Sequence, residues 1–154
     1  MNKKFFVSLF ISLVLLVLAF FQPYKLVVVV GNSMYPTLKN GQILLAKKVA
    51  KFEKGDIVVF KNDFEETVIK RIIFMPGEYY YFILEHDPYT TELIYDNSYR
   101  NILKFYDMYG ENHIQEQRIP AKEYYVIGDN HDNSDDSRRF GPIYEEQLMY
   151  KVIK

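Results

Sequence analysis

The sequence has no cysteine, no excess of positive charge, and no acidic residue before Glu53. The absence of cysteine excludes disulfides, thiolate metal sites and a cysteine nucleophile. Lys+Arg number 19 and Asp+Glu 20, a net charge of −1, so the chain lacks the strong positive field that draws a protein to nucleic acid, and we expect no such partner. The 154 residues suffice for one folded domain, and 49% hydrophobic against 25% charged residues excludes a disordered chain.

The hydrophobic residues are unevenly distributed, because Phe5–Phe21 is a run of 17 residues without a charge. As a helix it is about 25 Å long, at the short end of what crosses a bilayer. Lys3 and Lys4 precede it, and by the positive-inside rule they keep the N-terminus in the cytoplasm. We therefore predict a cytoplasmic tip and transmembrane anchor over residues 1–21, a lipid bilayer as partner, and an exported domain over residues 22–154.

A cleavable leader is the alternative interpretation of the same segment. It requires small residues in an Ala-x-Ala-like arrangement at the end of the apolar run. Ala19 is instead followed by Phe20, Phe21 and Gln22. This pattern favours an anchor that is retained.

The remainder of the chain predicts a mainly β, antiparallel domain, because short β-branched and aromatic runs alternate with Gly, Pro, Asn and Asp. Residues 85–120 have weak periodicity and are expected to form an insertion of loops and short strands. One or two helical turns are expected at Glu145–Met149. The expected strands are Leu26–Val30, Gln42–Lys48, Asp56–Phe60, Thr67–Phe74, Tyr79–Leu84, Glu123–Gly128 and Tyr150–Ile153.

Acidic side chains gather around His131, which raises the question of a metal site. A calcium loop that begins at Asn130 would place Asp135 where glycine is needed and Gly141 where glutamate is needed. A zinc site lacks a second nearby histidine. We expect no metal and no cofactor, and nothing in the sequence selects a Ser-His-Asp triad with His131 as base.

Two residues are candidates for nucleophilic catalysis. Ser33 lies in the turn Gly31–Leu38, where a strand ends and a hydroxyl is presented, although a serine in a turn is usually only a turn residue. Alternation along Thr67–Ile73 places Lys70 on the same face as apolar neighbours. Desolvation there lowers the pKa of the amine, which must fall from about 10.4 by roughly 2.5–3.5 for Lys70 to act as a base near neutral pH, at a cost of about 3.5–5 kcal/mol. The alternative is a lysine that reaches solvent from a sheet edge.

Four sequence blocks, in this order and after an anchor, resemble those of bacterial type I signal peptidase, in its compact Gram-positive form. The resemblance covers nearly the whole exported part, from about Val27 to Ile143. It implies a mainly β, membrane-bound serine protease that removes signal peptides from exported proteins with a Ser-Lys dyad and no cofactor. The blocks are Ser33–Thr37, Lys54–Asp56, Lys70–Arg71 with Pro76–Gly77, and Gly128–Gly141.

The resemblance also implies a role for individual residues. Ser33 matches the nucleophile, Lys70 the general base, and Ser134 the serine that orients the lysine amine. Charged residues that tie the loops together are matched by Asp136, Arg138 and Arg71, and the shallow pockets for small substrate side chains by Met34, Leu38 and Ile69.

Three positions depart from the family pattern. Gly31 stands where some members carry a serine whose hydroxyl completes the oxyanion hole, so the second donor is left open. Phe74 replaces a usual glycine and Glu78 a usual aspartate, both in the turn after Lys70.

Three other functions remain open on the sequence alone. One is a Ser-Lys peptidase dedicated to a single substrate, with the same chemistry. Another is a catalytically silent, membrane-anchored peptide-binding subunit, which would be free to lose Ser33 or Lys70. The third is a lipid- or peptide-binding β domain without chemistry.

Overall fold

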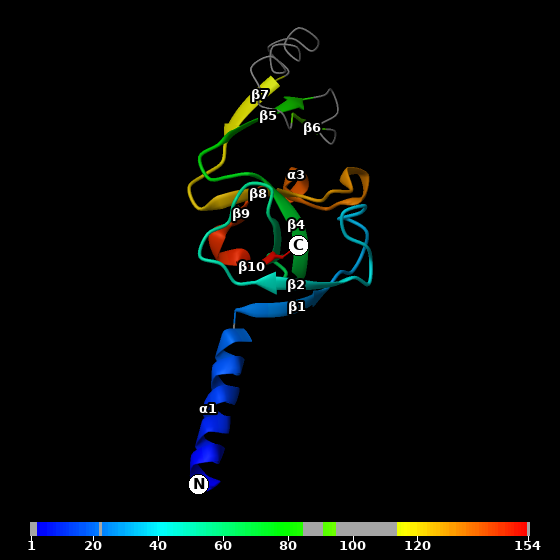
Figure 1. Cartoon of the computed structure of the whole chain (residues 1–154). Helices are drawn as coiled ribbons and strands as arrows, with labels where there is room; N and C mark the ends of the chain where they lie inside the picture. Colours follow the sequence, from blue (N-terminus) through cyan, green and yellow to red (C-terminus); the bar gives the residue numbers. More distant parts are fainter. Residues whose placement is uncertain (1–2, 22, 85–90, 95–113, 154) are drawn as a thin grey trace.

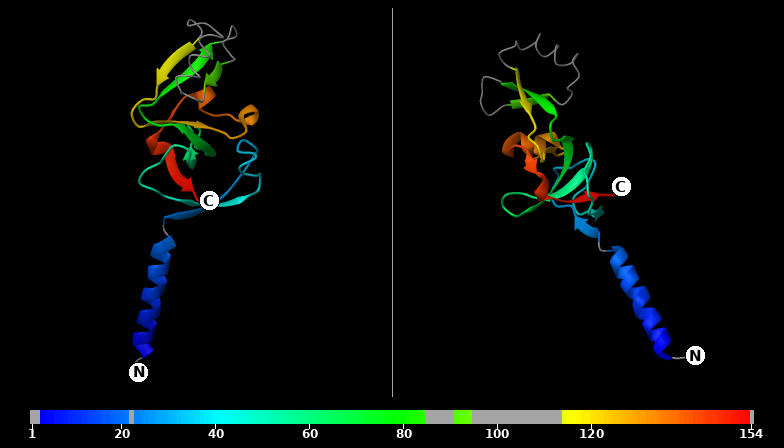
Figure 2. Two further views of the ribbon diagram at one scale, coloured as in Figure 1. Left: turned by 45° about the horizontal axis from the view of Figure 1, so that its top comes forward. Right: turned by 90° about the vertical axis from the view of Figure 1, so that its left-hand side faces the viewer.

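The computed structural model describes residues 3–21, 23–84, 91–94 and 114–153 (Figure 1). Helix α1, Lys3–Phe21, leads into the β domain, and Figure 2 shows it at the opposite end of the molecule from a small second sheet. Among the residues described, no helix meets both the length and the apolarity needed to cross a membrane. The spanning helix and the division of the chain at residue 21 therefore stay predictions.

The main sheet has seven strands, and every pairing in it is antiparallel. This confirms the mainly antiparallel β fold expected from the sequence. In spatial order the strands are β1 (Tyr24–Val28), β2 (Ile43–Lys47), β10 (Leu148–Val152), β3 (Ile57–Lys61), β4 (Thr67–Phe74), β8 (Glu123–Ile127) and β9 (Ile143–Tyr144).

Strand β3 lies at the centre of the core because both of its faces are buried. Ile57 and Val59 pack on one face, with Met34, Leu38 and Leu44 among others. Val58 and Phe60 pack on the opposite face, in a cluster of their own. A strand covered on both sides reads as a continuous apolar run, which is how Ile57–Phe60 reads in the sequence.

A second sheet of three strands has the order β6-β5-β7, with β5 at Tyr79–Leu84, β6 at Thr91–Ile94 and β7 at Ile114–Arg118. An aromatic cluster packs where the chain passes from β4 of the main sheet to β5 of the second: the Tyr80 ring lies 4.9 Å from that of Tyr125 and 5.7 Å from that of Phe74. Phe74, one of the departures from the family pattern, is thus a core residue and is 1% exposed.

The turn between β4 and β5 contains another of the three departures, Glu78. Its carboxylate accepts the Met75 backbone N–H at 2.8 Å and pairs with Lys54 Nζ at 3.0 Å. Gly77 has a φ of +83°, a conformation that glycine adopts without strain. The longer glutamate therefore closes the turn by a backbone contact.

Comparison with the sequence expectations shows where local pattern was sufficient. Thr67–Phe74 and Tyr79–Leu84 are confirmed to the residue, and the five other expected strands are present with ends shifted by one or two residues. The expected turn at Glu145–Met149 is the 3₁₀ turn η3, Glu145–Gln147. Of the expected insertion at residues 85–120, two short strands are described and the rest lies outside the described residues.

Two short elements were missed. Helix α3, Ser137–Phe140, begins because the Asp136 side chain accepts the Arg138 backbone N–H, and this four-residue segment has no helical periodicity to find. Strand β9 has two residues, and its pairing with β8 is a tertiary contact.

We predict that Phe60→Ala lowers the free energy of unfolding by about 3–5 kcal/mol, because the Phe60 ring is 0% exposed and its removal leaves a cavity. The measurement is urea unfolding of the detergent-solubilised chain. Phe64→Ala is the matched control, since Phe64 is 84% exposed, and it should change stability by less than about 0.5 kcal/mol. Equal losses in the two variants would contradict this account of the core.

Candidate active site

Ser33 lies in the loop between β1 and β2, which is held in place on both sides of the serine. The Gly31 N–H donates to Asn40 Oδ1 at 3.0 Å, and the Leu38 N–H donates to the Met34 carbonyl at 2.9 Å. Met34 and Leu38 are 2% and 5% exposed and anchor the loop in the core, whereas Ser33 is half-buried. The loop thus presents the hydroxyl from a fixed backbone.

Lys70 lies in β4 with its side chain in the interior and is 4% exposed. The alternation along β4 places it on the face that also carries Val68 and Ile72. Desolvation by this burial lowers the pKa of the amine, against the opposing charges of Asp136 and Asp135. The sequence expectation of a buried lysine with a lowered pKa agrees with this environment.

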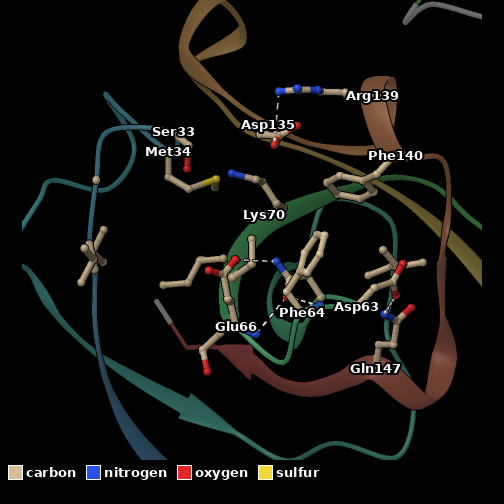
Figure 3. A pocket seen from close by; sticks show the side chains of 18 of the residues that line it. Ser33, Met34, Asp63, Phe64, Glu66, Lys70, Asp135, Arg139, Phe140 and Gln147 are labelled. Carbon is tan, nitrogen blue, oxygen red and sulfur yellow. Dashed lines mark hydrogen bonds and ion pairs between the residues drawn. The ribbon is translucent and has the colours of Figure 1, made fainter.

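Ser33 and Lys70 line the same open cleft, which has a volume of about 1060 Å³. Figure 3 shows the Lys70 amine directed toward the side of the cleft that carries Ser33 and Met34. The lining also includes residues of β1, the start of β4 and the loop after β8, together with the exposed rings of Phe64, Phe140 and Tyr144.

The three residues matched to substrate pockets lie near one another but differ in exposure. Met34 and Ile69 line the cleft. Leu38 belongs to the same apolar cluster as Met34 and is not among the lining residues. Leu38 therefore packs behind the cleft wall.

The residues that follow β8 form a loop that closes the cleft beside Lys70. Asp136 is 1% exposed and accepts hydrogen bonds from the Gly128 N–H at 3.0 Å and from Arg138 Nε at 2.8 Å. Burial alone would raise the pKa of Asp136, but these hydrogen bonds outweigh it and hold the pKa below its usual value. Arg138 also donates to the His131 carbonyl at 2.8 Å and so closes the loop on itself.

Ser134 lies inside this loop, against the backbone of Gly128. Its hydroxyl helps to lower the pKa of Asp136, yet within the described residues Oγ is buried without a partner that meets hydrogen-bond geometry. A Cβ added at Gly128 would lie 2.1 Å from Ser134 Oγ and 2.5 Å from the Ser33 carbonyl oxygen. Gly128 therefore permits the close approach of the Ser134 loop to the Ser33 loop.

Arg71, the residue after Lys70, forms a separate ion pair. Its Nε and one terminal nitrogen lie 2.8 and 2.6 Å from the two carboxylate oxygens of Asp129, and its other terminal nitrogen donates to the Gly55 carbonyl at 2.8 Å. Bidentate pairs of this kind fix orientation as well as distance. Arg71 thus ties β4 to the end of β8, while Asp136 and Arg138 tie the next loop.

Comparison with known proteins assigns the chain to a family. The model for signal peptidase, peptidase S26, matches residues 2–153. The chain belongs to this family, and it is a serine peptidase.

Curated signal peptidases of Gram-positive bacteria are among its relatives. It is 32% identical to signal peptidase I of Bacillus amyloliquefaciens, over 90% of this chain and 76% of that one. It is 34% identical to signal peptidase I S of Bacillus subtilis, over 77% of this chain and 66% of that one, and 30% identical to signal peptidase IB of Staphylococcus aureus, over 79% and 72%. A solved signal peptidase I from Enterococcus faecalis is 25% identical, with a TM-score of 0.41 and coverage of 69% of this chain and 99% of that one.

Sequence reasoning missed three residues that shape the peptidase site. Asp129 belongs to the block Gly128–Gly141 that carries the resemblance, but it was assigned no role, because its pairing with Arg71 joins positions 58 apart in the chain. Gly128 and Asn130 belong to the same block, and nothing in their local sequence indicates what they contact. Elsewhere in the described part of the chain, no three His, Asp or Glu side chains come together as metal ligands.

We predict that Lys70→Met stabilises the peptidase, because methionine fills a similar space without an amine to desolvate. The lowered pKa of Lys70 means that, between its native and unfolded pKa values, the unfolded chain holds a proton that the native chain lacks. The free energy of unfolding of the wild type therefore rises with pH toward about 10.4, by about 1.4 kcal/mol for each pH unit in that window.

The measurement is urea unfolding of both proteins between pH 6 and 10. The stability advantage of Lys70→Met should shrink as the pH rises. A difference that is constant over this range would show that Lys70 has an ordinary pKa in the folded protein.

Proposed function

We propose that the chain is a membrane-anchored serine endopeptidase that removes signal peptides from exported preproteins, with Ser33 as nucleophile and Lys70 as general base. The observation that carries the proposal is a lysine amine, 4% exposed and of lowered pKa, that shares a cleft with a half-buried serine. A serine hydroxyl needs an adjacent base to become a nucleophile, and a desolvated lysine supplies one. The relatives named signal peptidase I support the choice of substrate.

The reaction is an acyl transfer in two halves. Neutral Lys70 takes the proton of Ser33 as Oγ attacks the scissile carbonyl, and the resulting ammonium gives that proton to the leaving amine. A water molecule then gives a proton to Lys70 and attacks the acyl carbon. The bond from that carbon to Ser33 Oγ breaks, Lys70 returns the proton to Oγ, and the signal peptide leaves with a new carboxyl group. The Ser33 backbone N–H, for which the described residues provide no acceptor, is suited to hold the oxyanion.

In this proposal the surrounding residues have supporting roles. Ser134 Oγ, buried without a bonded partner among the described residues, is suited to accept a hydrogen bond from Lys70 and direct its amine at Ser33. Asp136, Arg138 and Arg71 hold the loops through their ion pairs. Met34 and Ile69 offer an apolar wall that fits small side chains next to the scissile bond.

An exposed apolar surface supports a position at the membrane. Leu26 pairs with Leu45, and Val28 with Ile43, so these four side chains share one face of the β1–β2 edge. They are 43–69% exposed, and we call them the β1–β2 apolar face. Exposed apolar patches of this kind mark membrane or protein contacts.

The position of this face in the chain favours lipid as its partner. Strand β1 begins three residues after the end of α1, whose apolar sequence suits an anchor. We propose a single-pass topology with the N-terminus in the cytoplasm and the catalytic domain on the outer side. Ser33 follows Phe21 by 12 positions, so the cleft stays close to the membrane from which a signal peptide emerges. Tethering both to one plane raises their effective concentration.

We predict that Ser33→Ala and Lys70→Met each abolish cleavage of a preprotein, since each removes one half of the dyad. The assay uses the detergent-solubilised full chain and a radiolabelled preprotein. Thr37→Ala and Lys48→Met are matched controls at exposed positions and should retain full activity. Turnover in either dyad variant would refute the mechanism, and wild-type cleavage of one preprotein in a broad panel would identify a dedicated peptidase.

We also predict that the β1–β2 apolar face is immersed in lipid. The chain contains no tryptophan, so Leu26→Trp, on this face and outside the cleft lining, supplies a single fluorescent reporter. In vesicles with brominated acyl chains its emission should be quenched. Tyr79→Trp, in the small sheet at the far end from α1, is the control and should keep its emission (Figure 1). Equal quenching of the two reporters by the brominated chains would contradict contact of this face with the membrane.

A further inference from the structure

Asn130 bonds to the backbone on both sides of the Ser33 Cα. Its backbone N–H donates to the Ser33 carbonyl at 2.9 Å, and its side-chain Nδ2 donates to the Asn32 carbonyl at 3.0 Å. The amide orientation is unambiguous, because its oxygen could not face a carbonyl oxygen. One residue thus holds both peptide groups that flank the nucleophile.

The hydrogen bond to the Asn32 carbonyl also affects the Ser33 N–H, because the Asn32 C=O and the Ser33 N–H belong to the same peptide group. That peptide is planar and trans, so its C=O and N–H point in opposite directions. The Asn32 carbonyl also accepts the Tyr35 N–H at 3.0 Å. Two donors on the carbonyl therefore fix the direction of the Ser33 N–H.

The position of Asn130 is fixed by a contact to β4, the strand that carries Lys70. Its neighbour Asp129 forms the bidentate pair with Arg71, which directly follows Lys70 in β4. Strands β1 and β4 are not neighbours, because β2, β10 and β3 lie between them in the sheet. The contacts from Ser33 through Asn130 and Asp129 to Arg71 bridge that separation.

We infer that Asn130 is a positioning residue that aims the Ser33 amide N–H at the oxyanion of the tetrahedral intermediate. The inference rests on the proposed function. Gly31 has no side-chain hydroxyl to offer as a second donor, so the direction of the Ser33 N–H matters more in this chain. Asn130 touches the backbone of the nucleophile and not the substrate, so it acts through Ser33.

The test compares Asn130→Ala and Asn130→Asp with the wild type, as full chains in detergent. Both substitutions remove the Nδ2 donor and keep the backbone N–H. We expect kcat to fall by about 10- to 100-fold, since a displaced donor loses oxyanion stabilisation, with KM within about twofold. The apparent pKa of the pH–rate profile should equal that of the wild type, because Lys70 is not touched.

A peptide aldehyde supplies a readout that general loosening of the site would not give. Ser33 Oγ adds to its carbonyl carbon, and the former carbonyl oxygen then occupies the oxyanion position. Its affinity for the variants should fall by about the same factor as kcat, whereas the corresponding peptide alcohol should bind as it does to wild type. Asp132→Asn, an exposed change in the same loop, is the control and should behave as wild type.

Three results would overturn the inference: unchanged kcat in both variants, a loss confined to Asn130→Asp, which would indicate charge, or a shift in apparent pKa, which would indicate an effect on Lys70. Ser33→Ala, measured in the same assays, distinguishes a failure of the proposed function from a failure of the role inferred for Asn130. Turnover in Ser33→Ala would refute the proposed function, whereas its inactivity together with active Asn130 variants would refute only the role of Asn130.

Discussion

The burial of the Lys70 amine is the constraint on which the rest of the site depends. Lys70 is 4% exposed, so its ammonium form loses most of its hydration in the folded protein. This desolvation lowers the pKa of the amine. The apolar face of β4 supplies the desolvation, while Asp136 and Asp135 oppose it without reversing it. Burial of the amine lowers stability and favours the uncharged form of Lys70, and perturbed pKa values of this kind are typical of functional sites.

In the proposed mechanism the Lys70 amine must lie beside the Ser33 hydroxyl, and the sheet alone does not bring the two together. Ser33 lies in a loop after an edge strand, whereas Lys70 lies in the interior of the sheet. The loop after β8 connects the two, through hydrogen bonds from the backbone and side chain of Asn130 to the serine loop and through the ion pair of Asp129 with Arg71. Gly128 lets these segments approach, because any side chain there would collide with Ser134 and with the Ser33 carbonyl. These contacts hold the serine loop, the loop after β8 and β4 in fixed relative positions, as the proposed acyl transfer requires.

The same architecture relates the cleft to its proposed surroundings. The β1–β2 apolar face, the end of α1 and the serine loop are consecutive in the chain, so a membrane that holds the first two also holds the third nearby. In the proposed topology, the cleft and a membrane-bound signal peptide are confined to the same surface, which raises the effective concentration of one for the other. The small sheet, at the opposite end of the molecule, lies away from this region (Figure 2).

The amino-acid pattern by itself determined most of the strands, the antiparallel class, and the two residues proposed for the chemistry. Alternation along Thr67–Phe74 was enough to place Lys70 among apolar neighbours, because side-chain direction in a strand is a local property. Tertiary structure alone decided which loops meet. The Arg71–Asp129 pair and the hydrogen bond from Asn130 to Asn32 join residues 58 and 98 positions apart. The need for glycine at position 128 comes from the close approach of two other loops, which no periodicity in the sequence encodes.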